Sequence, residues 1–144
     1  MRILAVDPGS VRVGLAVSDD TGTLASPLAT VPAGPDLALR LSATARERGA
    51  ARVVIGLPRR LDGSEGDEAA AARRLAAELE ATGATVELWD ERMTSRIAER
   101  SLAGRPRPRD RRAREKRRAE VDAVAAAVLL QSYLDRTPSA SSPR

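Results

Sequence analysis

Apolar positions occur in short runs at the start of the chain and at helical spacing further on. The runs at 3–6 and 13–17 flank a turn that contains Pro8, Gly9 and Ser10. This pattern predicts a β-hairpin whose first strand is buried on both faces. Beyond the hairpin, stretches with a helical period alternate with compact β-branched runs. The predicted strands cover 3–6, 13–17, 25–31, 52–57 and 85–89, and the predicted helices cover 36–48, 67–81, 96–102 and 119–135.

The order of these elements indicates an α/β fold. Three strands come first, and helices then alternate with the remaining strands. We therefore expect a mixed sheet whose first three strands form an antiparallel meander, with helices on both faces. Residues 1–135 are expected to form a single domain. Within it, 103–118 is expected to be a mobile basic loop, because prolines and like charges disfavour a helix, and the Ser/Pro-rich tail 136–144 is expected to be disordered.

Composition narrows the chemistry. The chain of 144 residues holds neither Cys nor His, which excludes thiolate catalysis, Ser-His triads and His/Cys zinc sites. An enzyme built from this chain is expected to use carboxylates, which suit Mg²⁺ or Mn²⁺. No apolar run is long enough to cross a bilayer, so no membrane partner is expected. The chain begins directly with an apolar strand and without the pattern of a secretion signal, so we expect a cytoplasmic location.

Acidic residues recur where the predicted strands end. In open α/β sheets the carboxyl ends of parallel strands form the ligand crevice, and carboxylates gathered there would repel one another unless divalent cations held them. Simpler explanations stay open for two of these acids. Asp7 could start a turn through its own hydrogen bonds, and Asp122, in the first turn of the predicted last helix, could be favoured by the helix dipole. The acids concerned are Asp7, Asp62, Asp90, Glu91 and Asp122.

Basic residues concentrate in one segment. The chain carries a net charge of +4, but residues 105–118 hold nine basic and two acidic residues. Such a segment on a mildly acidic body is typical of proteins that bind a polyanion, although it could also be a solvated surface. Aromatic residues make up only 1% of the chain, so we expect binding through phosphates and shape rather than through base stacking.

Four sequence motifs together resemble one known family. They are AVDPGSVRVGLAVSD, VVIGLPRRLDGSEG, WDERMTS and EVDAVAAAVLLQSYL, in this order along nearly the whole chain. This set resembles the YqgF/RuvX family, bacterial proteins of the ribonuclease H-like fold that are related to RuvC-type Holliday junction resolvases. The resemblance implies a two-metal-ion nuclease that trims the 5′ end of the precursor of 16S rRNA, with cleavage of branched DNA as another proposed activity.

The resemblance also implies roles for single residues. Asp7, Glu91 and Asp122 match the metal-binding acids, whereas Arg12, Gly14 and the Asp62-Gly63 turn match signature positions. The fourth predicted strand ends Gly56-Leu57-Pro58 without an acid, so the second acid comes from Glu91 or from Asp62, and Asp90 is a further candidate ligand. The residues expected to contact nucleic acid are Arg12, Arg59, Arg60, Arg92, Arg111, Arg112, Arg114, Lys116, Arg117 and Arg118.

Other functions remain compatible with the sequence. The DPGSVRVG hairpin resembles the phosphate loop of sugar kinases and actin-like ATPases, but those proteins use two such domains, and no GxxxxGK[ST] motif occurs here. A non-catalytic RNA-binding or ribosome-assembly factor with the same fold is the alternative to the nuclease. Monomer and homodimer are equally open, since a resolvase would favour a symmetric dimer and an RNA-trimming enzyme could act alone.

Overall fold

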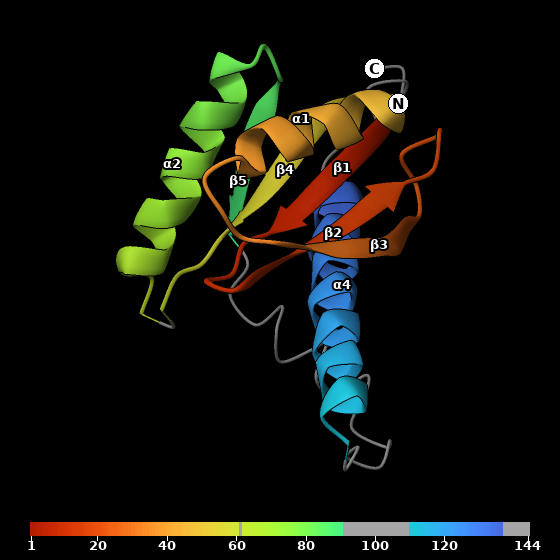
Figure 1. Ribbon diagram of the computed structural model, residues 1–144. Coiled ribbons are helices and arrows are strands. Elements are labelled where there is room, and N and C mark those ends of the chain that lie inside the picture. Colours follow the sequence, from red (N-terminus) through yellow and green to blue (C-terminus); the bar gives the residue numbers. More distant parts are fainter. Residues whose placement is uncertain (61, 91–109, 137–144) are drawn as a thin grey trace.

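A computed structural model of the protein describes residues 1–60, 62–90 and 110–136. Its centre is a mixed sheet with the strand order β3-β2-β1-β4-β5 (Figure 1). β1, β2 and β3 pair antiparallel, whereas β4 pairs parallel to both β1 and β5. The predicted sheet, including its antiparallel meander, is thereby confirmed. The strands are β1 (Arg2–Asp7), β2 (Arg12–Ser18), β3 (Ala25–Pro32), β4 (Ala50–Leu57) and β5 (Val86–Asp90).

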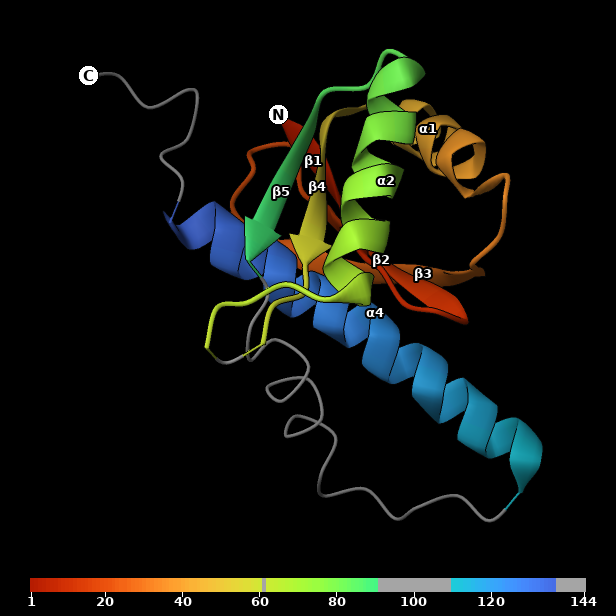
Figure 2. The same ribbon diagram turned by 90° about the vertical axis from the view of Figure 1, so that its left-hand side faces the viewer.

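Helices cover both faces of the sheet, as predicted. α1 (Leu37–Glu47) and α2 (Asp67–Ala81) lie on one face, and α4 (Arg111–Arg136) crosses the other (Figures 1 and 2). Because both faces are covered, successive side chains of a central strand alternate between two hydrophobic cores, one on each face of the sheet. Leu4 and Val6 pack toward α1 and α2, whereas Ile3 and Ala5 pack toward α4. The first strand is thus buried on both faces, which explains its uninterrupted apolar run.

The last helix begins earlier than its predicted start at about residue 119. Asp110 caps it, because its Oδ1 accepts a hydrogen bond of 2.8 Å from the backbone N–H of Arg112. An ion pair of 3.2 Å between Arg111 and Glu115 supports the first turns. The expectation of a loop is therefore wrong for residues 111–118, which are helical. The predicted helix 96–102, the remaining loop residues 103–109 and most of the tail lie outside the described residues.

Several contacts hold α4 on the sheet. At Gly14 of β2 the helix backbone comes so close that a Cβ atom would lie 2.0 Å from the carbonyl oxygen of Asp122. Near the other end of the helix, the buried Tyr133 packs edge-to-face on Trp89 at 5.2 Å between ring centroids. The Tyr133 hydroxyl also accepts a hydrogen bond of 2.6 Å from Arg52 of β4. Within the described ranges, no helix has the length and apolar character of a membrane span.

The contact at Gly14 predicts that even a small side chain at this position destabilises the fold. Gly14→Ala should lower the free energy of unfolding by about 1–3 kcal/mol or more, because the added methyl forces two backbones apart. The change is measured by urea denaturation. Gly34→Ala is the matched control, since its Cβ would meet its nearest atom, Asp36 Oδ1, at an ordinary 3.6 Å. Equal stability of the two variants would show that α4 does not lie against β2 in this way.

Candidate active site at the carboxyl edge of the sheet

Asp7 and Asp122 lie on the same face of the sheet. Asp7 ends β1 and stands directly opposite Gly14 in the antiparallel ladder. Residues that stand opposite each other in such a ladder project to the same face, and the face to which a Cβ of Gly14 would project is occupied by the backbone of Asp122. The close approach of α4 to β2 therefore brings an acid of the last helix beside the acid that ends the first strand.

Asp122 is paired with an arginine. Its Oδ2 accepts a hydrogen bond of 2.7 Å from Nε of Arg12, the first residue of β2, and the two side chains are 30% and 29% exposed. Because α4 begins at Arg111, Asp122 lies well inside the helix and not in its first turn. The explanation of Asp122 by the helix dipole is therefore wrong, since that effect fades beyond the first turn.

Asp90 reaches the same edge of the sheet from β5 but projects to the other face. Leu88 packs into the core under α1 and α2, and Trp89 packs into the core under α4. Strand alternation therefore directs Asp90 toward the α1 and α2 side, away from Asp7. Glu91 and Arg92, which were also predicted to belong to the site, lie outside the described residues.

Asp62 stabilises the loop between β4 and α2 through a hydrogen bond within the loop. Its Oδ1 accepts a hydrogen bond of 2.8 Å from the backbone N–H of Ser64. Hydrogen bonds from Ser64 hold the pKa of Asp62 below its ordinary value of 3.8. In the same loop Glu65 accepts two hydrogen bonds from Arg73, of 2.9 and 2.8 Å. These bonds lower the pKa of Glu65 from its ordinary 4.5, with a smaller contribution from Arg59.

The acids at this edge fit a divalent cation only in part. Asp7 and Asp122 offer carboxylate oxygens on one face, and oxygen ligands are those that Mg²⁺ and Mn²⁺ prefer. In the ranges that the structure describes, no three acidic side chains gather into a group that could hold a metal. The two acids thus fit part of a cation site, and a third carboxylate would have to come from outside these ranges, where Glu91 lies.

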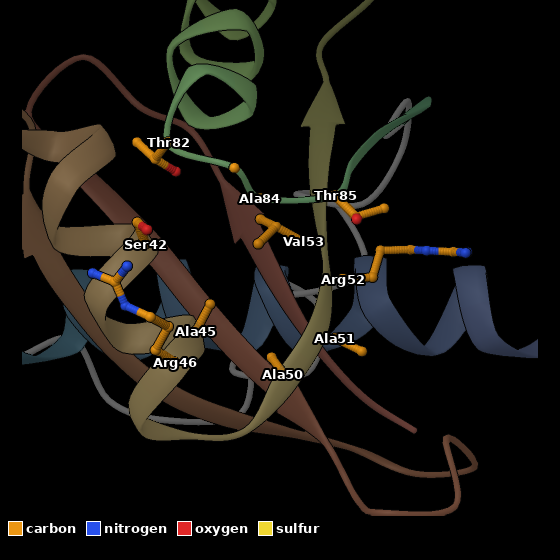
Figure 3. A pocket seen from close by; sticks show the side chains of 11 residues that line it. Ser42, Ala45, Arg46, Ala50, Ala51, Arg52, Val53, Thr82, Ala84 and Thr85 are labelled. Atoms are coloured by element: carbon orange, nitrogen blue, oxygen red, sulfur yellow. The ribbon is translucent and has the colours of Figure 1, made fainter.

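Surface depressions lie at both ends of the parallel strands, one at their carboxyl ends and one at their amino ends. One of about 310 Å³ follows the carboxyl end of β4 and is lined by Arg59, Arg60 and the start of α2. Another, of about 200 Å³, lies at the opposite edge between the ends of α1 and α2, with Arg46 and Arg52 on opposite sides of it (Figure 3). Only the first adjoins the edge that carries Asp7.

Apart from Arg12, the described basic residues that were expected to bind nucleic acid fall into two groups. Nη2 of Arg59 lies 3.5 Å from Oε2 of Glu65, and Arg60 donates hydrogen bonds to the Ser64 hydroxyl and to the Glu65 carbonyl. Both arginines therefore stabilise the loop after β4. The second group lies on the part of α4 that extends past the sheet (Figure 2). Its members are exposed except for the half-buried Arg117. They are Arg111, Arg112, Arg114, Lys116, Arg117 and Arg118.

Sequence reasoning left the role of Gly14 undefined. The structure shows that this position needs a residue without a side chain, because the backbone of α4 lies on it. A signal was present, since a lone glycine inside an apolar strand marks a close backbone approach. Asp110 was likewise missed, although an aspartate directly before a helix is a common N-cap.

The fold is that of ribonuclease H-like resolvases. Residues of this chain superpose on RuvC from T. thermophilus in complex with a Holliday junction substrate, with a TM-score of 0.54, 15% identity and coverage of 95% of this chain and 98% of that one. The Fowlpox virus resolvase bound to Holliday junction DNA gives a TM-score of 0.55 at 11% identity, covering 94% and 97% of the two chains. At such identities the likeness shows the fold.

Sequence comparison defines the family within this class. The profile of the RuvX family, described as Holliday junction resolvase, matches residues 1–136, and the chain belongs to this family. A relative from Anaeromyxobacter dehalogenans (strain 2CP-1), named "Putative pre-16S rRNA nuclease", is 47% identical over 140 residues, which cover 94% of this chain and 98% of the relative. A relative of the same name from Chloroflexus aggregans is 40% identical, with 92% of each chain covered. The resemblance seen in the motifs is confirmed.

The loop after β4 should lose its internal hydrogen bonds in acid. A carboxyl whose pKa is lowered on folding stabilises the fold above its ordinary pKa, and that contribution disappears as the pH falls through the lower, folded value. We therefore expect the Glu65 carboxyl to titrate below 4.5 and the Asp62 carboxyl below 3.8, with the amide resonance of Ser64 following Asp62. Carboxyl NMR titration measures both. In Arg73→Gln the pKa of Glu65 should rise while that of Asp62 stays low, and a wild-type Glu65 that titrates at or above 4.5 would contradict the arrangement.

Proposed function

We propose that this protein is a metal-dependent nuclease that hydrolyses phosphodiester bonds in structured nucleic acid. The observation that carries the proposal is the placement of Asp7 and Asp122 on one face of the sheet edge by the contact at Gly14. Membership of the RuvX family supports it. The substrate proposed first is the 5′ end of the precursor of 16S rRNA, after the name of the relatives, and branched DNA is the second.

Asp7, Glu91 and Asp122 are the proposed catalytic and metal-binding acids, with Mg²⁺ or Mn²⁺ as the cation. Glu91 lies outside the described residues and is proposed from its place in the WDERMTS motif. When bound, the divalent ions would activate the attacking water and stabilise the leaving oxygen. The chain itself contributes carboxylates and arginines, since it contains no histidine and only one lysine, Lys116.

The proposed interface with nucleic acid reads phosphates rather than bases. The described basic residues of the interface come from α4, from the loop after β4 and from Arg12, and Arg92 is proposed with them. Neither large aromatic side chain is arranged as a base platform, because Trp89 and Tyr133 pack against each other at an interplanar angle of 85°. Contacts with phosphates position a nucleic acid without reading its sequence, which suits recognition of a folded shape.

The competing function is a binding factor without catalysis, and the cleavage assay decides between the two. A cytoplasmic location is proposed from the sequence, which leaves both a monomer and a homodimer open.

Replacing Asp7 tests the nuclease directly. Asp7→Asn should lower the cleavage rate at least about 100-fold, because a ligand of a catalytic ion supplies several kcal/mol of transition-state stabilisation. Cleavage of rRNA-precursor and four-way-junction substrates is measured with Mg²⁺ or Mn²⁺. Asp36→Asn, at the start of α1 on the other face, is the control and should cleave like wild type. Equal cleavage by wild type and Asp7→Asn would assign the activity to a contaminant, and no cleavage of either substrate by wild type would favour the binding factor.

Removing charge from α4 tests the interface. Replacing Arg111, Arg112, Arg117 and Arg118 together by Ala should weaken binding to every sequence. It should also reduce the slope of log affinity against log salt by up to about 3.6, because each phosphate contact contributes roughly 0.7–0.9. Electrophoretic or fluorescence binding assays over a salt series give the slope. The control replaces the exposed Arg40, Arg46, Arg48 and Arg74, which lie on or next to α1 and α2. An unchanged slope in the α4 variant would remove this helix from the interface.

A further inference from the structure

Arg12 already provides a cation at one acid of the proposed site. Its Nε donates a hydrogen bond of 2.7 Å to Oδ2 of Asp122. Both side chains are partly exposed, so the pair lies where an ion or a phosphate from solvent can reach it. A hydrogen bond between charged groups is stronger than a neutral one, and any divalent cation that binds Asp122 must therefore compete with this guanidinium.

The backbones on both sides of this ion pair are fixed, whereas the arginine side chain is long and can rotate. Asp122 is held by the contact of its carbonyl with Gly14. Arg12 is held by its place in the β2–β3 ladder and by Gly9, where a Cβ would lie 2.4 Å from the Arg12 carbonyl oxygen. The Arg12 side chain can therefore leave Asp122 without movement of the sheet or of α4.

We propose that Arg12 is a resident counter-ion of Asp122 that a divalent cation displaces, and that the released guanidinium then binds a phosphate of the nucleic acid. This inference rests on the proposed function. A guanidinium suits both partners, because its planar set of donors matches the oxygens of a carboxylate and of a phosphate equally well. A bound cation would satisfy Asp122 and leave Arg12 with donors directed to the edge where the substrate lies.

Displacement of Arg12 from Asp122 makes the binding of the cation and of the nucleic acid cooperative. A cation that releases Arg12 creates a new phosphate contact, so it should strengthen the binding of nucleic acid. By thermodynamic linkage the nucleic acid must strengthen the binding of the cation by the same factor. An arginine that merely positioned Asp122 for the metal would have the opposite consequence, because its removal would weaken the metal site.

The decisive experiment measures Mn²⁺ affinity by calorimetry on the full chain, at fixed pH and salt and without nucleic acid. Arg12→Gln should bind Mn²⁺ about three- to fivefold more tightly than wild type, the factor expected from removal of a partly exposed competing ion pair. Arg40→Gln removes the same charge from α1 on the other face of the sheet and should leave the affinity unchanged. Asp7→Asn and Asp122→Asn should both weaken it.

The outcomes separate the two proposals. If Arg12→Gln binds Mn²⁺ no more tightly than wild type while both acid variants weaken binding, the counter-ion role is overturned and the metal site stands. If neither acid variant weakens binding, the metal site fails, and the counter-ion role fails with it.

A second measurement uses the wild-type chain, so that it does not depend on the folding of a variant. The Nε–H resonance of Arg12 in a ¹⁵N-labelled sample should shift on addition of Mg²⁺, because the guanidinium leaves Asp122. A resonance that stays in place at saturating Mg²⁺ would also overturn the counter-ion role.

Discussion

The close contact between α4 and β2 at Gly14 determines where the rest of the site lies. Two backbones meet there, and even a methyl group would come within 2.0 Å of the Asp122 carbonyl oxygen. Because Gly14 stands opposite Asp7 in the ladder, the same contact sets the position of Asp122 relative to Asp7. One packing constraint therefore serves both stability and the geometry of the proposed site.

Three carboxylates of the described residues each have a hydrogen-bond donor in place. Asp122 is paired with Arg12, Asp62 accepts a backbone N–H, and Glu65 is held by Arg73. The proposed site differs from the β4–α2 loop in one respect, since its ion pair joins residues 110 positions apart in the chain. An ion pair between β2 and α4 keeps a carboxylate satisfied at the edge of the sheet, so the fold does not need a cation in order to form there.

Elements with strong periodic patterns could be predicted from the sequence, and long-range contacts could not. α2 spans Asp67–Ala81 as expected, because its apolar stripe and the following Gly83 define both ends. The predicted start of α4 was wrong because the like charges of 111–118 and the preceding prolines argued against a helix. In the structure, the cap at Asp110 and the continuity with the apolar stripe outweigh that repulsion. The pairing of Asp122 with Arg12 depends on how α4 crosses the sheet, which no local pattern encodes. For Asp62 the turn-forming hydrogen bond to Ser64 was available from the Asp-Gly-Ser sequence alone.

The early start of α4 changes what the proposed site can recognise. A single helix now carries both an acid of the site and the basic residues that extend past the sheet (Figure 2). With a rise of about 1.5 Å per residue, Arg112 lies roughly 15 Å along the helix axis from Asp122. That separation is several times the axial rise per phosphate of one strand in a duplex, which is about 3.4 Å. Arg117 and Arg118 lie within about 8 Å of Asp122 along the axis, so even a short nucleotide at the acids comes near them. Only a longer, folded or branched polynucleotide spans from the acids to Arg111 and Arg112. Rigid attachment of the basic residues to the helix that carries Asp122 thus favours extended substrates without any contact to a base.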